Sequence, residues 1–161
     1  MQPVCDLRVK LILKAGRCLA AGVIGISLNA GSIADTLPKD QVDSRSLKLQ
    51  AFFKSYQCPQ PYYIDEYLRA ADAYAIDYRL LPALSVREST CGQHHRQNNH
   101  WGWDSARSGF ASVASGIEFV ASRLANGRYY KDKTLEGKLY VYNPYPQYVE
   151  QVKRLMREID N

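Results

Sequence analysis

The chain has 161 residues, 46% hydrophobic and 23% charged, a composition typical of one globular domain. Its formal net charge is +5, but four of the 21 basic side chains lie in residues 8–17. Residues 35–161 carry 17 basic and 15 acidic side chains without a basic cluster interleaved with aromatics, which argues against a nucleic-acid partner.

The first 34 residues have the pattern of a secretory signal peptide. A basic segment, residues 8–17, precedes an apolar run of 13 residues, 18–30, and Ser32 and Ala34 form an A-x-A-like cleavage site. The run is shorter than the about 20 residues that span a bilayer, and an uncleaved anchor is the alternative. We therefore expect an exported protein, secreted or periplasmic, without a stable membrane span once the signal is removed.

Hydrophobic periodicity after the signal predicts a single, mainly α-helical domain. Residues 35–60 form an N-terminal extension and residues 61–161 the main domain. No segment shows the sustained apolar–polar alternation that is typical of a β-strand. We expect Gly127 to end the fourth helix and Thr134 to cap the fifth. The predicted helices span residues 46–55, 65–76, 79–90, 112–126, 134–142 and 148–159.

Two of the four cysteines belong to the mature chain. Cys5 and Cys18 would leave with the signal peptide, so that Cys58 and Cys91 remain as one pair. In an exported protein such a pair most often forms a disulfide. Closing a loop of roughly 30 residues would stabilise the fold by about 3–4 kcal/mol. A free, catalytic thiol is the minor alternative.

The third predicted helix ends in a carboxylate that its apolar pattern does not explain. Leu81, Leu84 and Glu88 are spaced i, i+3 and i+7, so Glu88 continues the apolar stripe. Because burial disfavours a charged carboxylate, we expect Glu88 to keep its proton and to act as a general acid. The alternative is an ordinary ion pair with Arg87 or Arg96, or a bond from a backbone amide.

The long polar loop that follows, residues 91–108, has side chains that suit a sugar. The rings of Trp101 and Trp103 match the flat faces of pyranoses. Three amides can bond hydroxyl and N-acetyl groups, and they belong to Gln93, Asn98 and Asn99. Long loops in compact domains are often functional.

Three histidines in the same loop suggest a metal site as a second possibility. They are His94, His95 and His100. No cysteine of the mature chain is free to join them, and no His-x-x-x-His helix spacing occurs. We therefore expect the histidines to line or flank a cleft, and we expect no metal or other cofactor.

Four motifs, in this order, resemble the lysozyme-like superfamily: PALSVRES, NNHWGW, FASVASGI and YVYNPYPQYV. They are similar to bacterial N-acetylglucosaminidase domains, in which an A-x-x-x-E-S helix end precedes N-x-F-G. Soluble lytic transglycosylases share the E-S helix end and a later Y-N pair. The resemblance covers residues 64–159 and implies a lysozyme-like helical domain with a cleft.

The resemblance also implies roles for single residues. Glu88 matches the catalytic acid of the family, and Tyr142 matches a tyrosine that lies in the cleft near the acid. Asn99, Trp101 and Gly102 match N-x-F-G, with Trp in place of Phe. Further substrate contacts are expected from the neighbouring residues Trp103, Asp104 and Asn143.

The sequence departs from both subfamilies. Only 12 residues separate Glu88 from Trp101, too few for the β-hairpin lobe that carries a second carboxylate in many glucosaminidases. The G-L-M-Q motif of transglycosylases is absent. Asp104 and Asp77 are the candidate second carboxylates, although Asp77 suits a helix cap better.

These patterns predict an exported, monomeric enzyme that cleaves β-1,4 bonds of peptidoglycan glycan strands, as an N-acetylglucosaminidase or a muramidase. The anomeric carbon would be attacked by an activated water, by the acetamido group of the substrate, or by the muramic 6-hydroxyl. The last route would make the protein a lytic transglycosylase that leaves anhydro-muramic ends. An inactive glycan-binding or assembly module on the same fold is the alternative from another class.

Overall fold

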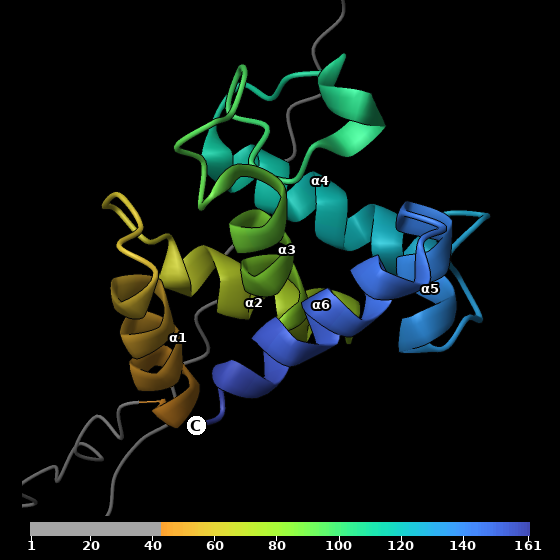
Figure 1. Cartoon of the computed structure of the whole chain (residues 1–161). Helices are drawn as coiled ribbons and strands as arrows, with labels where there is room; N and C mark the ends of the chain where they lie inside the picture. The colour runs from red at the N-terminus through yellow and green to blue at the C-terminus, as the bar shows by residue number, and fades with distance from the viewer. Residues whose placement is uncertain (1–42) are drawn as a thin grey trace, which may run out of the picture. The chain divides into compact units, whose positions relative to one another are not determined.

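The structure, a computed structural model, describes residues 43–161, so the predicted signal peptide lies outside the described residues. This part of the chain is mainly α-helical, as predicted, and contains no β-strand. All six predicted helices are confirmed, with ends within two residues of those expected. They are α1 (Ser44–Ser55), α2 (Ile64–Tyr74), α3 (Leu80–Ser89), α4 (Val113–Asn126), α5 (Leu135–Tyr142) and α6 (Pro146–Glu158), with a short 3-10 helix, η1 (Trp103–Ala106), before α4 (Figure 1).

Caps at the helix ends follow the sequence. The hydroxyl of Thr134 accepts a hydrogen bond from the backbone N–H of Gly137 at 3.2 Å, and Ser112 caps α4 in the same way. Each cap satisfies an N–H group that has no partner within the helix. At the end of α4, a Cβ on Gly127 would lie 2.5 Å from the carbonyl oxygen of Arg123, so a larger residue would displace the last turn.

Helix α3 lies at the centre of the fold (Figure 1). It packs against α6 and α4, while α2 packs on α4, α1 on α2, and α5 on α6. Helix α1 contributes Leu49, Phe52 and Phe53 to the common core, so the described part of the predicted N-terminal extension shares its core with the main domain. The largest fully buried side chains include Trp101, Leu49, Leu84, Ile117, Leu124 and Leu139.

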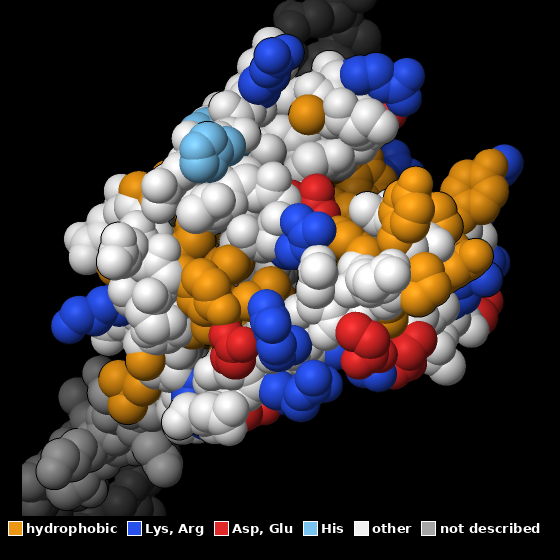
Figure 2. Space-filling view, viewed as in Figure 1, with side chains coloured by type: hydrophobic (Ala, Val, Ile, Leu, Met, Phe, Trp, Pro, Cys, Tyr) orange, Lys and Arg blue, Asp and Glu red, His pale blue; other side chains and the backbone are white. Residues whose placement is uncertain are grey.

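The outer surface mixes both signs of charge on the face that Figure 2 shows. Lys153 of α6 pairs with Glu136 of α5 at 3.0 Å and with Glu150 at 3.6 Å. Exposed pairs of this kind contribute about 0–1 kcal/mol each, so the fold depends on its core rather than on them. Within residues 43–161, no helix has both the length and the apolar character needed to cross a bilayer.

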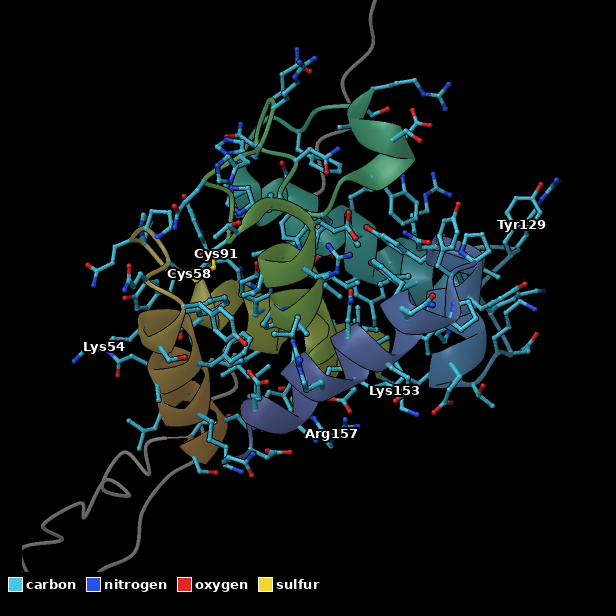
Figure 3. The ribbon with its side chains drawn as sticks, in the orientation of Figure 1. Lys54, Cys58, Cys91, Tyr129, Lys153 and Arg157 are labelled. Atoms are coloured by element: carbon cyan, nitrogen blue, oxygen red, sulfur yellow. A yellow bond between two sulfur atoms is a disulfide. The ribbon has the colours of Figure 1, made fainter. Side chains whose placement is uncertain are left out.

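Cys58 and Cys91 form a disulfide, which confirms the pairing expected from the sequence (Figure 3). Their Cα atoms lie 5.4 Å apart. Cys58 follows α1, whereas Cys91 lies two residues beyond the end of α3. The bond therefore fastens the start of the polar loop, residues 91–108, to the connection between α1 and α2.

Replacing both cysteines by alanine is expected to lower the free energy of unfolding by about 3 kcal/mol, because the cross-link no longer restricts the unfolded chain. Urea unfolding followed by circular dichroism measures this difference. A reducing agent should destabilise the wild type to the same extent and leave C58A/C91A unchanged. Equal stability of the oxidised wild type and the double variant would contradict the prediction.

Candidate active site

Glu88 lies in the wall of a pocket of about 650 Å³, a volume typical of ligand-binding pockets. Six of the residues that line this pocket were expected as site residues from the sequence: Glu88, Gly102, Trp103, Asp104, Tyr142 and Asn143. Four more lining residues were not: Ser105, Ser108, Tyr129 and Tyr130. The pocket therefore combines segments from α3, the polar loop, the α4–α5 connection and the end of α5.

The last turn of α3 presents Glu88 to this pocket. Leu81 and Leu84, on the same stripe of the helix, are buried, and Glu88 is half-buried at its end. Glu88 forms no ion pair with any described residue. Arg87 instead donates to the side chain of Gln151 at 2.8 Å, so the alternative of a simple ion pair does not hold.

Tyr148 of α6 is the direct partner of Glu88. Its hydroxyl donates to Oε1 of Glu88 at 2.6 Å, and only 3% of the residue is exposed. Burial, together with the adjacent Glu88 carboxylate, raises the pKa of Tyr148, so its hydroxyl stays a donor. The sequence analysis missed this contact. The signal was available, because Tyr148 lies four residues before Val152 on the buried face, and a buried tyrosine hydroxyl needs a partner.

Gly102 lies against the other oxygen of the same carboxylate. A Cβ at this position would be 3.0 Å from Oε2 of Glu88, and the φ angle of +59° also favours glycine. Because Oε1 accepts the bond from Tyr148, Oε2 is the oxygen left to meet a ligand in the pocket. Glycine keeps that oxygen accessible from the pocket.

Ser89, the second residue of the E-S pair, holds these parts together. Its hydroxyl donates to the carbonyl oxygen of His100 at 2.7 Å and accepts from the backbone N–H of Gly92 at 2.8 Å. Both bonds are buried. They fasten the end of α3 to the segment just before Gly102 and so fix the distance between Gly102 and Glu88.

Trp101 has a role different from the one expected. It is 0% exposed and packs edge-on against Tyr67 and Phe110, with ring centroids 6.3 and 6.2 Å away. Its indole N–H donates to the carbonyl oxygen of Leu81 at 3.2 Å. The expectation that this ring stacks on a sugar is therefore wrong, because the ring belongs to the core beneath the loop.

Asn99 is also structural rather than a substrate contact. Only 2% of it is exposed. Its amide nitrogen donates to the carbonyl oxygens of Trp103 and Ser108 at 2.9 and 2.8 Å, and its amide oxygen accepts from the N–H of Trp103 at 3.0 Å. All of its polar atoms are used to shape the loop, which leaves none for a ligand.

Gln93 and Asn98 do not line the pocket either. Gln93 donates to the carbonyl oxygen of Gln57 at 3.1 Å, and Asn98 donates to that of Phe110 at 3.0 Å. Both amides therefore hold chain segments outside the pocket, and the expected contacts with substrate are not supported at these positions.

Aromatic rings form one wall of the pocket. Trp103 packs edge-on against Tyr142, with centroids 5.9 Å apart, and lies 6.0 Å from Tyr130. The hydroxyl of Tyr142 donates to the carbonyl oxygen of Trp101. Burial, followed by the nearby charge of Glu88, raises the pKa of Tyr142 well above its usual value, so this donor also keeps its proton.

Asp104 supplies a second carboxylate to the pocket. Its oxygens accept from the hydroxyl of Ser108 at 2.9 Å and from the guanidinium of Arg107 at 2.6 Å. These bonds lower the pKa of Asp104, so it stays ionised near neutral pH. Asp77 lies outside the pocket, where it accepts from the backbone N–H of Arg79 at 3.0 Å and pairs with the Arg79 guanidinium at 2.5 Å. It precedes the N-cap of α3, which is Arg79 and has no side-chain cap.

None of the three histidines lines the pocket. His100 is buried against Trp101, with ring centroids 5.5 Å apart, and its ring centroid lies 4.7 Å from that of His95. A Cβ on Gly92 would lie 2.4 Å from the His100 ring, so glycine permits this close approach. Within residues 43–161, no group of three or more His, Cys, Asp or Glu side chains is arranged to hold a metal ion.

The backbone around the pocket is unusually strained. Seven non-glycine residues between positions 90 and 106 have positive φ: Thr90, Cys91, Gln97, Asn98, Asp104, Ser105 and Ala106. Such conformations persist only where the surrounding contacts enforce them, and they are common at functional sites.

No protein-family model, no curated protein and no solved structure matches the chain. The likeness to lysozyme-like proteins therefore rests on the sequence motifs, and the function is argued from the site itself.

The pH dependence of stability is expected to reveal the buried state of His100. Burial, assisted by the neighbouring His95, lowers the pKa of His100 from 6.5 to about 4. The unfolded chain therefore takes up the proton first, so this contribution to stability is complete above pH 6.5 and is lost as the pH falls to about 4.

The expected loss is up to about 3 kcal/mol in the free energy of unfolding. Urea titrations from pH 7 to pH 4 measure it. The variant H100Q should lack this part of the pH dependence, whereas H94Q, which changes an exposed histidine, should keep it. Identical pH profiles for H100Q and the wild type would contradict the assignment.

Proposed function

We propose that the chain is an exported enzyme of lysozyme-like type that cleaves β-1,4 glycosidic bonds in the glycan strands of peptidoglycan, with Glu88 as general acid. One observation carries the proposal. Glu88 ends a buried helix, faces a pocket of about 650 Å³, and has one oxygen bonded to Tyr148 and the other beside Gly102. A carboxyl group in such a setting suits proton transfer to a departing sugar oxygen.

The chemistry divides between the two carboxyl groups of the pocket. Oε2 of Glu88 gives its proton to the glycosidic oxygen as the bond to the anomeric carbon breaks. Asp104 stays ionised on the pocket wall, where its carboxylate is the candidate to orient an attacking water. Two carboxyl groups beside the scissile bond are typical of glycosidases.

The pocket lining suits an N-acetylated amino sugar. Trp103 and Tyr130 offer ring surface, while Asn143, Ser105 and Ser108 offer hydrogen bonds to hydroxyl and acetamido groups. The Cys58–Cys91 disulfide suits an oxidising compartment, which agrees with export.

Purified sacculi are the substrate that tests the proposal. The wild type should release soluble fragments, and E88Q should release them at a rate at least about 100-fold lower, since general acid catalysis contributes 10²–10⁴-fold. Urea unfolding of E88Q should be close to that of the wild type. Binding of sacculi by both proteins without release would instead support an inactive glycan-binding or assembly module.

Mass spectrometry of the released fragments identifies the reaction. Reducing glucosamine or muramic ends would show hydrolysis as a glucosaminidase or a muramidase. Anhydro-muramic ends would show that the muramic 6-hydroxyl attacks, which makes the protein a lytic transglycosylase. Absence of both binding and release would contradict the proposal.

Removal of the Tyr148 hydroxyl is expected to slow the release of fragments from sacculi. This hydroxyl holds Oε1 of Glu88 at 2.6 Å, so Y148F should leave the carboxyl group less well positioned. We expect the rate of release to fall by about 10- to 100-fold. The control Y140F removes an exposed hydroxyl on α5 and should keep the rate of the wild type. An unchanged rate in Y148F would exclude a role of Tyr148 in positioning Glu88.

A further inference from the structure

Several large hydrophobic side chains of the described residues are exposed, and one of them lines the pocket. The large hydrophobic residues with high exposure are Leu47, Phe119, Tyr129, Tyr140, Val141 and Tyr145. Four of them fall between positions 129 and 145, and Figure 2 shows hydrophobic side chains gathered on the side where α5 lies. Exposed apolar residues are common on protein surfaces, so the informative one is Tyr129, which also lines the pocket.

Tyr129 joins this group to the pocket. It is 58% exposed, and it also lines the pocket that holds Glu88. Figure 3 shows Tyr129 pointing outward from the connection between α4 and α5. The same residue therefore faces both the pocket and the solvent beyond it.

The segment that carries Tyr129 is held in place. The ammonium group of Lys138 donates to the carbonyl oxygens of Leu124 and Tyr130, at 2.5 and 2.8 Å. The backbone N–H of Tyr130 donates to the carbonyl oxygen of Gly127 at 2.8 Å. These bonds tie the connection to the end of α4, so Tyr129 is presented from a fixed loop.

The ring of Tyr129 is itself oriented by a neighbour. The guanidinium of Arg128 lies 4.4 Å from the ring centroid, within the range of a cation–π contact. The residue stays more than half exposed with Arg128 in place, so ring surface remains for a ligand. An exposed ring that is already oriented loses little conformational freedom on binding.

The chemistry around Tyr129 favours a sugar over a protein partner. The pocket it borders combines tyrosine and tryptophan rings with polar groups from Asp104, Ser105, Ser108 and Asn143. A pyranose has a flat apolar face and a rim of hydroxyl groups, which matches this combination. The core of a protein interface is depleted in charged residues, whereas Glu88 and Asp104 both line this pocket.

We propose that Tyr129 forms a distal sugar subsite, where it stacks on a ring of the glycan away from the bond that Glu88 cleaves. This inference rests on the proposed function, and it adds a substrate preference. The site takes oligomers of N-acetylated amino sugars that are long enough to reach from Glu88 to Tyr129, and it binds disaccharides weakly.

Binding to chito-oligosaccharides of defined length tests the subsite without cleavage. The full chain carrying E88Q serves as the reference, and calorimetry gives Kd for oligomers of two, four and six sugars. Affinity should rise with length in this reference. Adding Y129A should weaken binding of the longest oligomer roughly tenfold and leave the shortest unchanged.

Two controls separate ring stacking from other effects. Y129F in the same background should bind like the reference, because it keeps the ring, and Y140A should also bind like the reference, because Tyr140 does not line the pocket. An equal loss of affinity for short and long oligomers in Y129A would show that Tyr129 is not distal. No loss of affinity in Y129A would overturn the subsite, while binding near Glu88 and the proposed function would be unaffected. If no oligomer binds the reference, both the subsite and the proposed function fail.

Discussion

The hydroxyl of Ser89 is the contact on which the candidate site depends. It joins the end of α3 to the polar loop through one bond to the carbonyl oxygen of His100 and one from the N–H of Gly92. Without it, two buried backbone groups would lose their partner, at a cost of about 1–3 kcal/mol each. The position of Gly102 opposite Glu88 follows from this junction, because Gly102 lies two residues after His100.

Helix α6 and the polar loop place the two oxygens of the Glu88 carboxyl group in different surroundings. α6 reaches one oxygen through the hydroxyl of Tyr148, and the loop leaves the other beside a residue without a side chain. One oxygen therefore accepts a hydrogen bond, and the other lies beside Gly102. The aromatic rings and Asp104 form the remaining wall of the pocket that Glu88 lines.

The helices were predictable from the sequence because the residues that form and cap each helix are close to one another in the sequence. Apolar spacing set their length, Thr134 and Ser112 marked two starts, and Gly127 marked one end. The disulfide was predictable by elimination, since Cys58 and Cys91 were the pair left in the mature chain. The helices depend on residues that are neighbours in the sequence, and the disulfide follows from the number of cysteines in the mature chain. Neither requires coordinates.

The site was predictable only in part. Six of its lining residues came from the motifs around Glu88 and Tyr142, whereas Tyr129 and Tyr130 approach from the connection between α4 and α5 and carry no local signal of that approach. For Tyr148 the sequence indicated a buried hydroxyl that needs a partner, but not that the partner is Glu88. For the polar loop, the sequence predicted contacts with a ligand at residues that the structure shows to be buried. Its amides and indole look like ligand contacts in sequence, whereas the strained backbone needs Asn99 and Trp101 for its own hydrogen bonds and packing.

The alternation within the loop has a consequence for any mutational survey of this protein. Asn99 and Trp101 are buried, while Gly102 and Trp103 reach the pocket, so inward- and outward-facing residues adjoin in the sequence. A survey scored only by the proposed glycan cleavage would give all four positions the same importance. Melting curves of the same variants would distinguish the two groups, because substitutions of the buried residues should lower the melting temperature and substitutions in the pocket should not.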